Sequence, residues 1–121
     1  MKILATFIGL MSALVSIAAS APDASRGRAA FEKRCSGCHA LDRVMVGPPL
    51  RAIFGRPAGR DSGFSYSDAL RKSTVTWDAA TLDRWLTDTE TVVPGNEMAF
   101  RLGDAAERGD IIAYLKQLAG R

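Results

Sequence analysis

The most restrictive feature of this sequence is a cluster of three residues between positions 35 and 39. The chain has two cysteines and one histidine, and all three lie in the stretch CSGCH, as Cys35, Cys38 and His39. Two thiols separated by two residues can form a disulfide, act as a redox pair, contribute half of a zinc site, or become bonded to one cofactor. Each chemistry requires a different fold around the motif, so the rest of the sequence must decide among them.

The first 21 residues have the pattern of a secretory signal peptide. Lys2 supplies a positive charge, residues 3–18 form an apolar run, and residues 19–21 (Ala-Ser-Ala) place small side chains where a signal peptidase reads them. We therefore expect a signal peptide at residues 1–21 and a mature domain at residues 22–121, exported to the periplasm and without a membrane span. An uncleaved N-terminal anchor is the alternative, but the apolar run is short for a membrane-spanning helix.

Charge is distributed unevenly along the chain, which has 16 lysines and arginines and 13 aspartates and glutamates. Residues 22–72 contain ten basic and five acidic residues, whereas residues 73–121 contain five basic and eight acidic ones. A basic first half and an acidic second half produce a dipolar surface. No stretch combines dense lysine or arginine with aromatic residues, so the composition argues against nucleic-acid binding.

The mature region begins with a helical signal that leads directly into the cysteine motif. Asp23 can cap a helix whose apolar residues Ala30 and Phe31 face one way and which runs into Cys35. Gly27 would weaken this helix by about 1 kcal/mol relative to alanine. Its presence there indicates a position where another helix crosses closely.

Further helical signals follow, and no pattern indicates a β-hairpin. Residues 67–72 can form a short helix, and Asp78 can cap another, with Leu82, Trp85 and Leu86 at helical spacing. In the last helix Asp104 and Glu107 have the spacing of a capping box, Gly120 marks the end, and the apolar face comprises Ile111, Ile112, Tyr114, Leu115 and Leu118.

The segments between these helices are long and rich in turn-forming residues. Prolines and glycines interrupt residues 47–65, and residues 94–96 (Pro-Gly-Asn) form a turn. The sequence thus predicts an all-α domain of three to five helices joined by long loops. Such loops are unusual in so small a domain, and they become reasonable if they wrap a bound group.

This helical context selects among the chemistries of the motif. A structural zinc site needs four ligands, and this chain offers three that are too close together to surround one ion. A redox pair of the thioredoxin type belongs in a βαβ unit, and a plain disulfide would leave His39 unexplained. The pattern C-x-x-C-H is the attachment signature of a c-type haem, in which each thiol bonds one vinyl group and the adjacent histidine lies under the iron.

The sequence also resembles the class I c-type cytochromes over nearly all of the mature region. It is most similar to the small soluble carriers of the mitochondrial and cytochrome c2 type. The resemblance is carried by CSGCH (35–39), GPPL (47–50), FGRPAG (54–59), GFSYSDAL (63–70), TW (76–77), PGNEM (94–98) and IIAYLKQL (111–118). It implies the small cytochrome c fold, with one haem c attached through Cys35 and Cys38. It further implies that the N-terminal helix, with Gly27 and Phe31, crosses the C-terminal helix.

His39 is expected to be the proximal iron ligand, and the sixth ligand cannot be a second histidine because the chain has only one. Met45, Met98, a lysine or no ligand at all remain possible from composition. Met45 lies only six residues after His39, on a segment that must leave the proximal side. The resemblance places the sulfur ligand at Met98, directly after the turn at residues 94–96. It also implies that the Pro48 carbonyl accepts a hydrogen bond from His39 and fixes the ring.

The resemblance assigns roles to residues beyond the iron ligands. Buried haem propionates require hydrogen-bond donors, and these would be Arg56, Tyr66 and Trp77, with Ser67 as a weaker candidate. Apolar side chains expected to contact the haem are Leu50, Leu82, Trp85, Leu86 and Phe100. The chain departs from the mitochondrial pattern in having Leu70, Trp85 and Asn96 where asparagine, tyrosine and threonine are common. The polar network near Met98 should therefore be altered.

The expected function is that of a soluble periplasmic carrier of single electrons, which is monomeric and is not an enzyme. It would form weak, transient complexes with redox partner proteins. A ring of lysines around the haem edge is missing, and Glu90 and Glu97 lie near the ligand loop instead. Two alternatives remain open: a haem subunit of a larger oxidoreductase, and a haem protein that reacts with gases or peroxide.

Overall fold

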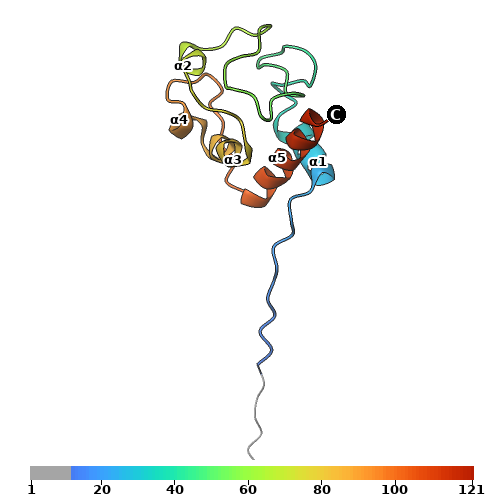
Figure 1. Cartoon of the computed structure of the whole chain (residues 1–121). Helices are drawn as coiled ribbons and strands as arrows, with labels where there is room; N and C mark the ends of the chain where they lie inside the picture. Colours follow the sequence, from blue (N-terminus) through green and yellow to red (C-terminus); the bar gives the residue numbers. More distant parts are fainter. Residues whose placement is uncertain (1–11) are drawn as a thin grey trace, which may run out of the picture.

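Helices are the only regular elements over residues 12–121, the part of the chain that the computed structural model describes (Figure 1). They are α1 (Ala24–Arg34), α2 (Asp68–Arg71), α3 (Ala79–Thr87), α4 (Thr89–Val92) and α5 (Ala105–Ala119). The predicted all-α architecture is confirmed in this range. α4 is the one helix that the sequence did not predict.

The helices begin where the sequence places their capping residues. The Asp23 carboxylate accepts a hydrogen bond from the backbone N–H of Arg26 at 2.8 Å and starts α1. Asp78 and Thr81 form a reciprocal capping box at the start of α3. At α5, Asp104 accepts from the backbone N–H of Glu107 at 3.0 Å. The expected box at α5 is not completed, because the Glu107 side chain bonds to Arg34 instead.

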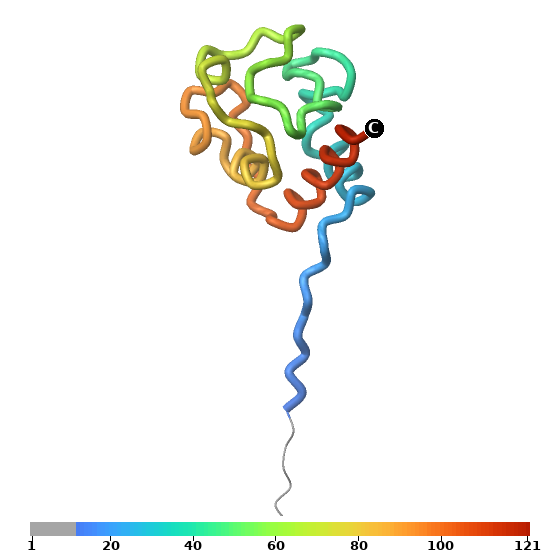
Figure 2. Tube along the Cα trace, viewed as in Figure 1, coloured from blue at the N-terminus to red at the C-terminus, as the bar shows by residue number. Residues whose placement is uncertain are grey.

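α1 and α5 cross and pack against each other, as Figures 1 and 2 show at the lower right of the molecule. Gly27 lies at the crossing, where a Cβ atom would overlap the backbone oxygen of Asp110 and approach Tyr114 Cβ to 2.9 Å. Beside it, the rings of Phe31 and Tyr114 meet edge to face with centroids 5.5 Å apart. The predicted close approach at Gly27 is confirmed.

Charged side chains reinforce this crossing on its solvent side. Arg26 Nε lies 3.0 Å from Asp110 Oδ2, and Arg34 Nε lies 2.7 Å from Glu107 Oε1. The hydrogen bond from Arg26 holds the pKa of Asp110 below its ordinary value, and the hydrogen bond from Arg34 does the same for Glu107. Because both arginines are exposed, each pair contributes little to stability.

The chain from Cys35 to Ser67 contains no helix and forms the loop-rich half of the domain (Figure 2). Backbone hydrogen bonds attach it to the segment before α3. Gly55 N–H donates to Trp77 O at 2.6 Å, Trp77 N–H donates to Arg56 O at 2.9 Å, and Ala58 N–H donates to Val75 O at 2.8 Å. These bonds hold the long loop opposite α3 and α5, and a cavity remains between them.

Residues 12–21 leave the helical body as extended, exposed chain, as Figure 1 shows. The remainder of the expected signal peptide, residues 1–11, lies outside the described residues. Within the described part, no helix has the length and apolar composition needed to cross a membrane.

Candidate haem site

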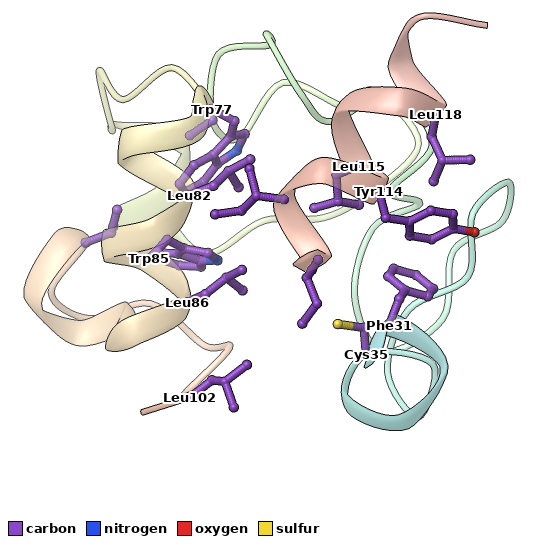
Figure 3. Close-up of a cluster of buried hydrophobic side chains, with 14 residues drawn as sticks. Phe31, Cys35, Trp77, Leu82, Trp85, Leu86, Leu102, Tyr114, Leu115 and Leu118 are labelled. Atoms are coloured by element: carbon purple, nitrogen blue, oxygen red, sulfur yellow. The ribbon is translucent and has the colours of Figure 1, made fainter. Parts of the chain in front are cut away.

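A cavity of about 270 Å³ occupies the space between α3, α5 and the long loop. Its wall is largely apolar and includes core residues of both helices, among them Leu82, Leu86, Ile111 and Leu115. Figure 3 shows Leu82 and Leu86 of α3 facing Leu115 of α5 across the interior, with Cys35 at one edge. An apolar pocket with few polar groups is the kind of site that holds a large cofactor.

The two cysteines lie together on one wall of this cavity, at the end of α1. Neither forms a disulfide; Cys35 is buried and Cys38 is exposed. Burial raises the pKa of the Cys35 thiol to about 11, with smaller contributions from the charges of Glu107 and Cys38. In Figure 3 the Cys35 sulfur points toward the interior, on the side where Trp85 and Leu86 lie.

His39 is buried in the same wall, and a contact with Pro48 orients its ring. Its Nδ1 lies 2.8 Å from Pro48 O. Because a carbonyl oxygen can only accept, Nδ1 carries the proton and the lone pair is on Nε2. Burial lowers the pKa of His39 and the bond to Pro48 opposes this effect, so the ring is favoured in the neutral form that binds metals.

Gly47 explains how the His39 ring fits so closely against the backbone. A Cβ at this position would lie 2.6 Å from His39 Nδ1 and 2.9 Å from Nε2. The Gly47 N–H also donates to Cys38 O at 2.8 Å, which closes the chain around the ring. Among the glycines of the loop, this one is required by the histidine itself.

Met98 lines the cavity and Met45 does not. Met98 lies on the segment after α4, 59 residues beyond His39. The next residue, Ala99, has φ +47°, in the left-handed region that costs a non-glycine residue roughly 1–2 kcal/mol. The backbone is therefore held in an unfavourable conformation immediately beside the expected sulfur ligand.

The expected donors to the propionates are divided between the cavity and its outside. Tyr66, Ser67 and Trp77 line the cavity, whereas Arg56 does not. Arg56 instead extends toward Asp61, with Nη1 3.8 Å from Oδ2. Ser67 Oγ accepts from the Leu70 N–H at 3.2 Å and caps α2, so its hydroxyl is already partly engaged.

Two aromatic donors remain available in the cavity wall. The Tyr66 hydroxyl accepts from the Asp61 N–H at 3.2 Å, which leaves its own proton free to donate. Trp77 also lines the cavity and is only 4% exposed, and its indole N–H is a second donor. Donors in the wall of an apolar cavity are what a site for a carboxylate-bearing group requires.

The remaining expected residues, Pro48, Trp85 and Phe100, also line the cavity, as do Leu50, Leu82 and Leu86. The rings of Trp77 and Trp85 pack with centroids 5.0 Å apart. Sequence reasoning did not identify Arg34, Val46, Ile53 and Phe64 as lining residues. Phe64 follows Gly63 within the matched stretch GFSYSDAL, and its aromatic character was the available signal.

The side chains present fit a covalently held haem. Two thiols, a neutral imidazole and a thioether converge on one apolar cavity with two aromatic donors in its wall. The zinc alternative has no support in the described residues, where no group of three or more His, Cys, Asp or Glu side chains could hold a metal ion.

Comparisons with known proteins agree with this geometry. A family model described as Cytochrome c matches residues 24–119. The chain is 41% identical to a cytochrome c of Chlamydomonas reinhardtii, over 82% of this chain and 92% of that protein. It is 44% identical to cytochrome c2 iso-2 of Magnetospirillum fulvum, over 69% of this chain and 91% of that protein.

A solved structure gives the same result. Cytochrome cH from Methylobacterium extorquens superposes with a TM-score of 0.75 and 44% sequence identity, covering 78% of this chain and 98% of that one. The expected resemblance to class I c-type cytochromes, the small helical fold and the haem c cofactor are confirmed. The chain belongs to the cytochrome c family, which holds haem c covalently at a C-x-x-C-H motif.

Proposed function

We propose that this protein is a soluble periplasmic carrier of single electrons, with Cys35 and Cys38 as attachment points and His39 and Met98 as axial ligands. The observation that carries the proposal is the convergence of these four side chains on one apolar cavity. When bound, the haem iron supplies a reversible one-electron change between its ferrous and ferric states.

The two axial side chains determine what kind of haem protein this is. His39 is held by Pro48 so that Nε2 presents its lone pair. A Met98 thioether would favour the softer ferrous state and so raise the reduction potential relative to a second histidine. If both side chains held the iron, no coordination position would be left for a substrate, which favours electron transfer over catalysis.

The wall of the cavity supports this role by limiting how much the site changes when an electron enters or leaves. Tyr66 and Trp77 supply hydrogen-bond donors for the propionates, while Arg56 lies outside the cavity beside Asp61 and contributes a positive charge at longer range. Trp85, Phe100 and the leucines exclude water. An apolar site without mobile water reorganises little during electron transfer.

Periplasmic localisation rests on the N-terminal segment. Residues 12–21 are exposed chain outside the helical body, whereas Asp23 is already part of it through a 2.7 Å bond from its N–H to Asp110. Cleavage after Ala21 would remove this exposed segment and keep Asp23 with its bond to Asp110. The mass of the exported protein should correspond to a chain that starts at Pro22, and a mass that includes residues 1–21 would favour an anchor.

Replacement of Met98 tests the proposal directly. Met98→Ala should open the sixth coordination position, abolish the sulfur-to-iron absorption band, lower the reduction potential and allow cyanide to bind rapidly to the ferric protein. Met45→Ala is the matched control, since Met45 lies outside the cavity, and it should change none of these. A normal spectrum in Met98→Ala would contradict the ligand assignment.

A further inference from the structure

The segment that carries Met98 is held in place by two side chains that do not line the haem cavity. Asn96 lies two residues before Met98, and its Oδ1 accepts hydrogen bonds from the backbone N–H groups of Met98 at 2.9 Å and Ala99 at 3.2 Å. Both bonds fix the backbone at the residue that bears the sulfur. They also hold Ala99 at its left-handed φ of +47°.

Asn96 is itself held by Glu90, the second residue of α4. Asn96 Nδ2 donates to Glu90 Oε2 at 3.3 Å and to Val93 O at 3.0 Å. The Glu90 carboxylate also accepts from the Gly95 N–H, with Oε1 at 3.0 Å and Oε2 at 3.2 Å. Both carboxylate oxygens therefore face N–H donors of the turn, although Glu90 is exposed on its outer side.

The other end of the segment is fastened by a buried residue. Thr89 is 1% exposed, and its backbone N–H donates to Phe100 O at 3.2 Å while its Oγ1 accepts from the Phe100 N–H at 3.1 Å. Residues 95–100 are thus fixed on both sides of Met98 by α4. Among the described residues, only Asn96 and Glu90 have side chains that bond to the backbone of residues 95–99.

We propose that Glu90 is a positioning residue for the Met98 thioether, acting through Asn96. Its carboxylate fixes the turn and the Asn96 amide, and Asn96 fixes the backbone of Met98, so the sulfur is directed into the cavity by the protein. Glu90 does not line the cavity, and its charged carboxylate instead holds the turn through hydrogen bonds from Gly95 and Asn96. This inference rests on the proposed role of Met98 as the axial ligand.

The rate at which an added ligand binds to the ferric protein measures the effect, because Met98 must move away before cyanide or imidazole can enter. Glu90→Gln preserves size but places an NH2 group against the N–H donors of Gly95 and Asn96. Loss of these charge-assisted hydrogen bonds should raise the binding rate of imidazole about tenfold. The sulfur-to-iron absorption band should weaken in the same variant.

A second variant tests the connection between the two side chains. Asn96→Asp keeps an acceptor for the N–H groups of Met98 and Ala99, but it removes the donor to Glu90 and sets two carboxylates against each other. It should raise the rate at least as much as Glu90→Gln. A rate equal to that of the unmodified protein would show that Glu90 does not act through Asn96, and would overturn the proposal.

Glu32→Gln is the matched control. Glu32 undergoes the same change of charge, but it is an exposed residue of α1 that pairs with Arg28 and does not line the cavity. The rate of this variant should stay within about twofold of the unmodified protein. Equal effects of Glu90→Gln and Glu32→Gln would mean that only the net charge matters, and would overturn the proposal.

The Met98→Ala background separates this inference from the proposed function. If Met98 is the ligand, Met98→Ala alone accelerates imidazole binding, and adding Glu90→Gln then changes nothing further. A Glu90 effect that persists without Met98 would overturn the positioning role while leaving the ligand assignment intact. Unaccelerated binding in Met98→Ala alone would instead overturn the ligand assignment, and with it this inference.

Discussion

At the scale of single residues, the two thiols of the motif occupy unequal environments. Cys35 is buried at the end of α1 and Cys38 is exposed beside it. A thioether at Cys35 would therefore be protected by the protein, and one at Cys38 would lie near the cavity mouth. Loss of either bond removes one covalent connection, and loss of Cys35 also removes a side chain from the core.

Serine replacements test the two attachments separately. Cys35→Ser and Cys38→Ser should each leave at most one thioether and sharply lower the yield of holoprotein, and Cys35→Ser should also reduce stability because a hydroxyl replaces a buried thiol. Acid extraction of haem measures the covalent fraction. Normal covalent haem in the double serine variant would contradict attachment at this motif.

The site was predictable to the extent that its residues belong to short, ordered motifs. Cys35, Cys38 and His39 stand out by spacing alone, and the resemblance to the cytochromes c indicated Met98, after a proline-glycine turn; all four line one cavity. Arg56 was expected among the residues around the haem but lies outside the cavity beside Asp61. The position of a long side chain on a loop depends on neighbours that spacing does not reveal. The hydrogen bonds of Glu90 with Gly95 and Asn96 could not be predicted from the sequence for the same reason.

At the scale of helices, Gly27 makes the sharpest prediction. Gly27→Ala would place a methyl group in the backbone of Asp110 and force α1 away from α5. We expect the holoprotein to lose roughly 1–3 kcal/mol of its free energy of unfolding, the usual cost of overpacking, despite the better helix propensity of alanine. Denaturant unfolding monitored by circular dichroism measures this loss.

Gly103→Ala is the matched control for this experiment. Gly103 is exposed, and a Cβ there would meet no atom within 4 Å. Its free energy of unfolding should therefore change little. If Gly27→Ala were as stable as Gly103→Ala, the two helices would be able to separate at the crossing without cost.

Helix prediction succeeded where capping and periodicity coincide and failed where neither is available. α1, α3 and α5 each follow an aspartate cap and bury an apolar face. α4 has only four residues, TETV, with no room for a helical repeat, and it forms because Asp88 accepts from the Glu90 N–H at 3.1 Å. At α5 the expected capping box does not form, because the Glu107 side chain pairs with Arg34 and this charged pair is the stronger bond.

At the scale of the whole molecule, the charges at the cavity mouth nearly cancel. The exposed lining residues are Arg34, Cys38, Val46 and Glu97, and Arg34 is already paired with Glu107. Val46 is 75% exposed and supplies an apolar surface beside Cys38. A redox partner would therefore meet an apolar mouth with one charge of each sign, and not a ring of one sign.

This balance predicts a shallow dependence of electron transfer on salt. Charge complementarity acts mainly on association rates and is screened beyond about 8 Å at physiological ionic strength. We expect the rate with the native oxidant to change less than about tenfold between low and high salt. Stopped-flow measurements over that range provide the test, and a hundredfold loss would reveal a strong charge pattern elsewhere on the surface.

The packing of α1 against α5 also affects the order in which the protein folds and takes up its cofactor. The domain's first helix needs its last one, because 11 residues form a marginal helix in water on their own. If the chain is exported N-terminus first, as proposed, its two thiols emerge before residues 105–119, and we expect cofactor attachment to precede closure of the fold. A chain arrested before residue 105 should accordingly leave both thiols open to alkylation, and protection of Cys35 in such a chain would refute this order of events.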